Sequence, residues 1–293
     1  MRANTFVERE PELEQLQHFL SKASVGQGQV CFVTGEAGAG KSALVHEFVR
    51  RAQENDVNVV AAVGQCYAQT GLGDAYLPFR EVLSVLSGVE DEKQTAHTVN
   101  ATNAARLKEF VRISGETLLA VGPDLIGLFV PGASLLAKIA TTAATKSNLA
   151  DKLAKQVSKP AQPVAGAAKL NPDLDQEKIF AQYASVLQVL TQQHTLILIL
   201  DDLHWADSAS LNLLFHLART LSASRVLLIG AYRPADVALG RAGERHPLEP
   251  LVNGLVRYNG EAIVELADMA SSAGRAFVGA LVDSEPNQLD SAF

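Results

Sequence analysis

The sequence predicts an α/β fold of three layers, in which helices cover both faces of a mostly parallel sheet. Three observations lead to this prediction. Short apolar runs, typical of strands buried on both faces, alternate with segments whose apolar residues recur at helical spacing. The first run, residues 30–34, leads into a glycine-rich loop that a helical segment follows. A later run, residues 195–202, ends in two acidic residues. Alternating strands and helices of this kind favour a parallel sheet.

The glycine-rich loop, residues 35–42 with the sequence GEAGAGKS, fits the phosphate-binding pattern G-x-x-x-x-G-K-[ST] at every required position. Glycines let successive backbone N–H groups point into one concavity around phosphate oxygens, and the following helix directs its positive end at the same anion. Lys41 supplies a charge for the β- and γ-phosphates, and Ser42 supplies a hydroxyl for Mg²⁺. We therefore expect nucleotide contacts from Gly35, Glu36, Ala37, Gly38, Ala39, Gly40, Lys41, Ser42 and Ala43.

The composition is that of a soluble globular protein, with 47% hydrophobic and 19% charged residues in a chain of 293. The formal charge of -7 argues against a dedicated nucleic-acid surface, which is usually basic. The two cysteines, Cys31 and Cys66, make no disulfide framework, and no signal peptide is visible, so we expect a cytoplasmic protein. Prolines and Lys138 interrupt the apolar segment 118–144, which is therefore not expected to span a membrane.

The first half of the chain supplies one part of the predicted nucleotide-binding domain, residues 1–87. Its expected elements are a helix at 10–23, the strand and loop at 30–42, the helix after Ser42, a strand at 57–63 and a helix at 78–86. Residues 88–172 interrupt this pattern as a helical insertion. Helical composition at 104–121 and 134–157 is followed there by a Pro/Ala/Gly linker at 158–166.

The second part of the domain is predicted at residues 173–240. Its expected elements are helices at 173–193 and 208–221 and strands at 195–202 and 225–233. Asp207 stands where a helix N-cap is wanted, and capping is the preferred interpretation over a chemical role. Residues 241–293 are expected to form a helical tail, with a helix at 248–258, and to begin a continuation beyond Phe293.

Three of the predicted strands end in chemically active groups: the glycine-rich loop, the pair Asp201 and Asp202, and Arg233. Parallel strands can end at one edge of a sheet, which is where ligands bind. Asp201 is the candidate for holding Mg²⁺ through water, together with Ser42. Asp202 is the candidate for orienting or deprotonating the attacking water. Arg233 could reach the γ-phosphate. Lys41, Asp202 and Arg233 are thus the catalytic candidates, and Ser42 and Asp201 are the metal ligands.

Each of these assignments has a structural alternative. The acidic pair could cap the next helix, and Arg233 could form a surface ion pair. His204 is expected to be a packed or hydrogen-bonded loop residue rather than a catalyst, and Trp205 a packing wedge rather than a platform for a base. The sequence has neither a Cys/His cluster typical of zinc nor a G-x-S-x-G elbow.

Four motifs in order, at residues 6–13, 35–42, 201–207 and 230–234, resemble the AAA-type P-loop ATPase domain of STAND signalling proteins. Such domains precede tetratricopeptide repeats, nucleotide cyclases or LuxR-type regulators. The resemblance implies an AAA-type (ASCE) P-loop fold, ATP or ADP with Mg²⁺, a resting form that holds ADP and an ATP form that oligomerises with itself. It also implies that Val7 and Arg9 contact the base and ribose and that Arg233 is the first sensor. Glu8 departs from the family, which usually has glycine there.

The resulting hypothesis is a signal-transduction ATPase, switched by ADP and ATP, that regulates output or sensor domains or protein partners outside this chain. Hydrolysis is expected to be slow, because Asp202 is shorter than the glutamate more often found there and should position water less well. One alternative is a DNA-associated, origin-binding-like AAA+ ATPase, which the acidic charge and the lack of a recognisable helix-turn-helix disfavour. Another is a scaffold that binds nucleotide without turnover. Adenine nucleotide is the expected ligand, and neither nucleic acid nor a membrane is an expected partner.

Overall fold

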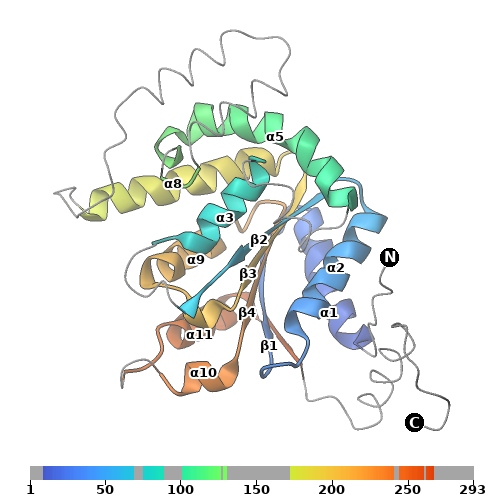
Figure 1. Cartoon of the computed structure of the whole chain (residues 1–293), viewed down its shortest axis with the longest axis vertical. Helices are drawn as coiled ribbons and strands as arrows, with labels where there is room; N and C mark the ends of the chain where they lie inside the picture. The colour runs from blue at the N-terminus through green and yellow to red at the C-terminus, as the bar shows by residue number, and fades with distance from the viewer. Residues whose placement is uncertain are drawn as a thin grey trace, which may run out of the picture.

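A parallel sheet forms the centre of the molecule, with the strand order β2-β3-β4-β1-β5 among the described residues (Figure 1). The computed structural model describes residues 9–68, 75–88, 101–126, 128–130, 172–240, 244–260 and 262–266. The strands are β1 (Gln29–Thr34), β2 (Val59–Gln65), β3 (Thr195–Asp201), β4 (Val226–Tyr232) and β5 (Ile263–Glu265). Each of their four pairings is parallel, so the predicted α/β fold with a parallel sheet is confirmed.

The strands are buried on both faces, which explains their continuous apolar sequences. Alternate residues point to opposite sides: Val30 and Phe32 join one core cluster, whereas Cys31 and Val33 join the other. Helices α1 (Glu10–Ser24) and α2 (Lys41–Asn55) cover one face. The other face carries α3 (Leu77–Leu86), α8 (Pro172–Leu190), α9 (Ser208–Thr220) and α11 (Leu248–Asn259), and Figure 1 shows the resulting three layers.

Part of the predicted insertion is described, and that part is helical. It contains α5 (Ala101–Val121) and the short helix η2 (Pro123–Leu125), and α5 lies next to α8 (Figure 1). Arg106 of α5 donates hydrogen bonds to the backbone carbonyls of Asp56 and Val59, each at 3.0 Å. These bonds fix α5 to the connection between α2 and β2. The helix expected at 134–157 and the linker at 158–166 lie outside the described residues.

The chain after residue 240 differs from the expected helical tail. The predicted helix is confirmed as α11, but Ile263–Glu265 then adds strand β5 beside β1. Sequence periodicity missed this strand because three residues are too few to show alternation. Its place is decided by pairing, since Phe32 N–H donates to Ala262 and Leu266 N–H donates to Thr34. The rest of the tail, residues 267–293, lies outside the described part.

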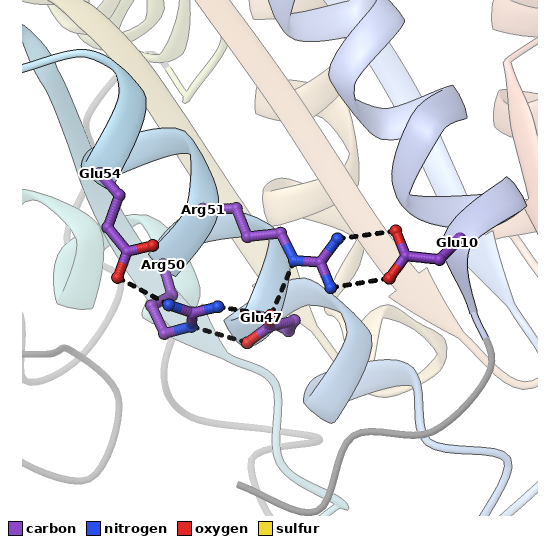
Figure 2. A network of polar contacts seen from close by, with 5 residues as sticks. All are labelled: Glu10, Glu47, Arg50, Arg51 and Glu54. Atoms are coloured by element: carbon purple, nitrogen blue, oxygen red, sulfur yellow. Dashed lines mark hydrogen bonds and ion pairs between the residues drawn. The ribbon is translucent and has the colours of Figure 1, made fainter.

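Helix α1 is fastened to α2 by a network of charged side chains (Figure 2). The carboxylate of Glu47, whose side chain is 6% exposed, accepts hydrogen bonds from Arg50 and Arg51. Arg51 also forms a bidentate pair with Glu10 of α1, with N–O distances of 2.7 and 2.8 Å, and Arg50 pairs with Glu54. Hydrogen bonding from Arg50, aided by that from Arg51, lowers the pKa of Glu47. The network therefore holds the first residue of α1 against the helix that follows the glycine-rich loop.

Helices that could cross a bilayer are absent from the described residues, because none there is both long and apolar enough.

Candidate nucleotide-binding site

The glycine-rich loop connects the end of β1 to the first residue of α2. Gly38 and Gly40 adopt φ values of +81° and +88°, and a Cβ added to either would meet no atom within 4 Å. It is therefore the left-handed backbone, and not lack of space, that favours glycine at both positions. Gly40 is also the N-cap of α2, so the loop places backbone N–H groups at the positive end of a 15-residue helix. This is the geometry that phosphate binding requires.

Most residues predicted to contact the nucleotide are accessible in this loop. The exposed positions are Glu36, Ala37, Gly38, Gly40, Ser42 and Ala43, Ala39 is half-buried and Gly35 is buried. Lys41 is also buried, and its Nζ spans the loop to donate to the carbonyls of Gly35 at 2.8 Å and Glu36 at 2.9 Å. An ammonium has three donors, so one remains for a ligand. Burial, followed by the charge of Arg233, lowers the pKa of Lys41, while Asp201 and Asp202 act in the opposite direction.

Asp201, at the end of β3, faces the first turn of α2. Its Oδ2 accepts a hydrogen bond from Ser42 Oγ at 2.7 Å, and its Oδ1 accepts one from the backbone N–H of Asp202 at 2.9 Å. Mg²⁺ prefers oxygen ligands and is usually held by one or two carboxylates together with substrate phosphates. The hydroxyl and carboxylate oxygens brought together here fit that preference. The pKa of His46 in α2 is lowered by burial of its side chain, while the nearby charge of Asp201 acts in the opposite direction.

Asp202 has an unusual backbone, with φ +51° in a residue other than glycine. Such conformations cost energy and cluster at functional sites. Its Oδ2 accepts a hydrogen bond at 3.0 Å from Nε2 of Gln65, the last residue of β2, and the register of β2 and β3 sets Gln65 beside Asp201. The backbone N–H of Gln65 donates in turn to Glu81 at 2.6 Å. Sequence analysis missed Gln65; the available signal was a polar residue at the end of an apolar strand.

Arg233 follows β4 at the same edge of the sheet and is the N-cap residue of the short helix α10 (Pro234–Ala238). Its Nη1 lies 3.8 Å from Oδ2 of Asp236, and its side chain is 37% exposed. The guanidinium lowers the pKa of Lys41, so the two cations lie within electrostatic range of each other. The structure thus brings Arg233 together with Lys41, Ser42, Asp201 and Asp202. It also pairs Arg233 weakly with Asp236, which the sequence analysis had not named.

The residues after the acidic pair form a one-turn helix, η3 (Leu203–Trp205), packed against the end of β4. The prediction that His204 is a packed loop residue agrees with its 1% exposure. Burial lowers the pKa of His204, while Asp202 and Asp236 act in the opposite direction. Trp205 contacts the His204 ring but is 40% exposed, so it is only partly a packing residue. Capping by Asp207 is confirmed, because its Oδ1 accepts from Ser210 N–H at 2.9 Å.

The residues that the resemblance assigns to the base and ribose are described only in part. Val7 and Glu8 lie outside the described residues. Arg9 is the N-cap residue of α1, and its Nη1 lies 2.9 Å from Oε1 of Glu12 in the first turn. The contacts of Val7 and Arg9 with a nucleotide stay predictions.

Comparisons with known proteins agree with this geometry at the level of the family. No curated protein matches the chain in sequence. Among solved structures, VirB4 of Thermoanaerobacter pseudethanolicus is similar over 87% of this chain and 80% of that chain, with 14% identity and a TM-score of 0.30. A similarity this low says nothing about function. The family described as "AAA ATPase domain" matches residues 5–229, which is more than half of the chain. The chain therefore belongs to the AAA ATPase domain family.

Proposed function

We propose that this chain is the ATP-binding, slowly hydrolysing module of a STAND-type signalling protein, switched between ADP and ATP forms. The observation that carries the proposal is the direct contact of Ser42 with Asp201, which joins the phosphate-binding loop to the acidic end of β3. Lys41, Asp202 and Arg233 surround the same point. The acidic charge of the chain, -7, argues against nucleic acid as the partner.

Phosphoryl transfer depends mainly on positioning and charge stabilisation, and the site offers groups for both. Backbone N–H groups of residues 35–42 and the Lys41 ammonium would bind the phosphate oxygens. Ser42 and Asp201 would hold Mg²⁺, which neutralises phosphate charge when bound. Asp202 would orient the attacking water and accept its proton. Arg233 would contact the terminal phosphate and stabilise the charge that develops on it.

Two features of Asp202 support slow turnover. Its side chain is one methylene shorter than that of glutamate, so it reaches less far toward a water at the terminal phosphate. One of its oxygens already accepts a hydrogen bond from Gln65, which restrains the carboxylate at the side of β2. A long-lived ATP complex is what a switch requires, because the output must persist between binding and hydrolysis.

The test measures binding, turnover and assembly on the same preparation. We expect calorimetry to detect both ATP and ADP, and multiple-turnover phosphate release to fall well below the about 10 s⁻¹ typical of enzymes. Light scattering should give a larger mass with ATP and the Asp202→Asn variant than with ADP. Rapid phosphate release by a monomer would contradict the proposal.

The same preparation separates the alternatives. If phosphate release is the same in Asp202→Asn as in the unmodified chain, the chain is a nucleotide-binding scaffold. If it binds duplex DNA tightly, with an affinity that falls steeply as salt rises, the DNA-associated function replaces the signalling one.

A further inference from the structure

The sheet has an open edge at β5, on the side away from β1. Among the described residues, β5 is the last strand of the order β2-β3-β4-β1-β5 and pairs only with β1. The carbonyl of Ala262 accepts a hydrogen bond from β1, and the N–H of Leu266 donates one to it. Because backbone groups alternate in direction along a strand, the N–H and C=O groups of Ile263 and Glu265 point away from β1. Unpaired groups of this kind are a template for a further strand.

A groove of about 1020 Å³ lies along this edge, between α1 on one face of the sheet and α11 on the other. Its walls include Glu14, His18 and Lys22 of α1, Val256 of α11 and Ile263 of β5. The Ile263 side chain is 44% exposed, whereas the apolar residues of β1, β3 and β4 are buried. The edge therefore combines an unpaired backbone, an accessible apolar side chain and a charged wall.

The side of α1 that lines the groove carries opposite charges on either side of His18. Glu14 stands one turn before His18 and Lys22 one turn after it, so the three residues share one side of the helix. Within the part of the chain that the structure describes, neither Glu14 nor Lys22 forms an ion pair. A pattern with opposite charges about its centre is complementary to a second copy of itself that runs in the opposite direction.

An antiparallel pairing of β5 with β5 of a second copy uses both the backbone and the charges. The two-fold axis of such a pairing is normal to the sheet, so both α1 helices stay on the same face and run in opposite directions. Glu14 of each copy then faces Lys22 of the other across the line where the two strands meet. Ile263 and Glu265 exchange backbone hydrogen bonds between the copies. A strand of three residues pairs weakly by its backbone alone, so the charges of α1 contribute to both the strength and the direction of pairing.

We propose that two copies of this chain associate through β5, which continues the sheet from one molecule into the other, and that Glu14 and Lys22 set the antiparallel direction. None of the residues that carry this pairing is among the nucleotide-binding candidates, so it requires no nucleotide. The inference goes beyond the proposed ATP switch, because it gives the chain a partner surface that is present in every nucleotide state.

Charge reversal distinguishes this pairing from association through any other surface. Glu14→Lys places two cations opposite each other between identical copies, and Lys22→Glu places two anions there, so each variant should pair poorly with itself. An equimolar mixture of the two variants restores opposite charges at both places, and so does the double variant Glu14→Lys/Lys22→Glu. Ile263→Lys adds a charge at the open edge, a device by which natural edge strands avoid pairing. Glu177→Lys, exposed on α8 at the other face of the sheet, is the matched control.

Sedimentation velocity on the full chain of 293 residues, without nucleotide and over a range of concentrations, measures the pairing. The unmodified chain and Glu177→Lys should reach the mass of two chains, and Ile263→Lys should keep the mass of one. The Kd of the dimer should rise at least about tenfold in each single reversal, because like charges across an interface oppose association. It should return to within about threefold of the unmodified value in the mixture and in the double variant.

Three outcomes would overturn the pairing. The first is an unmodified chain that keeps the mass of one chain at every concentration, the second a dimer that single reversals leave unchanged, and the third a mixture that associates no better than its components. A strand from another protein would then be the occupant of the groove if an added extended peptide binds there. Because no nucleotide is present, each of these results leaves the proposed ATPase function untouched.

Amide hydrogen exchange on the unmodified chain decides the matter even if a variant fails to fold. The N–H groups of Ile263 and Glu265 should exchange more slowly as the concentration rises from separate chains to dimers. The N–H of Leu266 already donates to Thr34, so its exchange should depend much less on concentration. Equal slowing at all three positions, or slowing at none of them, would contradict the proposed register.

Discussion

The hydroxyl of Ser42 lies 2.7 Å from a carboxylate oxygen of Asp201, although 159 positions separate the two residues in the sequence. The contact exists because β1 and β3 are parallel strands on either side of β4, so the loop after one and the acid ending the other meet at the same edge. It places a hydroxyl and a carboxylate within reach of one small cation, as a magnesium site beside a phosphate loop requires.

Loss of either partner should abolish the effect of magnesium on ATP affinity. We expect ATP to bind Ser42→Ala and Asp201→Asn with the same Kd whether Mg²⁺ or a chelator is present, because the first variant lacks the hydroxyl and the second lacks the negative charge that would hold the metal. Calorimetry in both conditions makes the comparison. Ser185→Ala is the control, since the Ser185 hydroxyl donates to the Ala181 carbonyl one turn earlier in α8, away from the glycine-rich loop. A magnesium effect of normal size in both site variants would show that the metal lies elsewhere.

Lys41→Met should weaken ATP binding by at least about tenfold, equivalent to 1.4 kcal/mol, because it removes the positive charge held across the loop. The left-handed turns at Gly38 and Gly40 should persist, since glycine adopts this backbone conformation without strain. Calorimetric Kd values measure the loss. Lys22→Met, at the end of α1, removes the same charge away from the loop and should bind ATP normally. Equal affinities in the two variants would remove Lys41 from the site.

Asp202→Asn should retain ATP binding and lower phosphate release by about 10²- to 10⁴-fold, the usual contribution of a general base. The amide keeps the size of the carboxylate but cannot accept a proton from water. Single-turnover release of labelled phosphate gives the rate, and calorimetry gives the affinity. Asp124→Asn changes a carboxylate that pairs with Lys178 and Gln182 beside η2, and it should leave both unchanged. A proportional loss of binding would mean that Asp202 holds the nucleotide instead.

Glu47→Gln should destabilise the fold by about 1.5–3 kcal/mol at neutral pH, the range for hydrogen bonds to charged groups. The folded pKa of Glu47 is below its ordinary value of 4.5, so its stabilising contribution is present above that pH. The contribution declines as pH falls below 4.5 and the carboxylate takes up a proton. Chemical denaturation between pH 7 and pH 3 should therefore show the free energies of unfolding of Glu47→Gln and of the unmodified chain converging as the pH falls.

Glu54→Gln provides the matched comparison for Glu47. Among the described residues its carboxylate bonds Arg50, and its side chain is 58% exposed, so its removal should cost about 0–1 kcal/mol. If the free energies of unfolding of Glu47→Gln and the unmodified chain converge at high pH instead of low pH, the lowered pKa assigned to Glu47 is wrong.

Asp207→Ala should lower stability by about 0.5–2 kcal/mol, the usual cost of losing an N-cap, while kcat and Kd for ATP stay unchanged. Asp207→Ser should recover most of that stability, because a serine hydroxyl can also accept from Ser210 N–H. Thermal unfolding and phosphate release are measured on both variants. A large loss of kcat without loss of stability would give Asp207 the chemical role that its capping geometry argues against.

The sequence alone determined those features that lie within one short segment. The turns of the glycine-rich loop, the buried strands and the Asp207 cap each depend on residues at most a few positions apart, so local backbone preference encodes them. The sequence also placed Asp201, Asp202 and Arg233 at strand ends, and parallel pairing then brings those ends together.

Tertiary structure alone decided which side chains meet across those ends. Gln65 bonds Asp202 because the register of β2 and β3 aligns them, and three-residue β5 exists because β1 has an edge to pair with. Asp236 of α10 reaches His204 of η3 because η3 packs against the end of β4, from which α10 continues. Contacts of this kind join residues from separate elements, so no periodicity or short motif can carry them; only the packed sheet does.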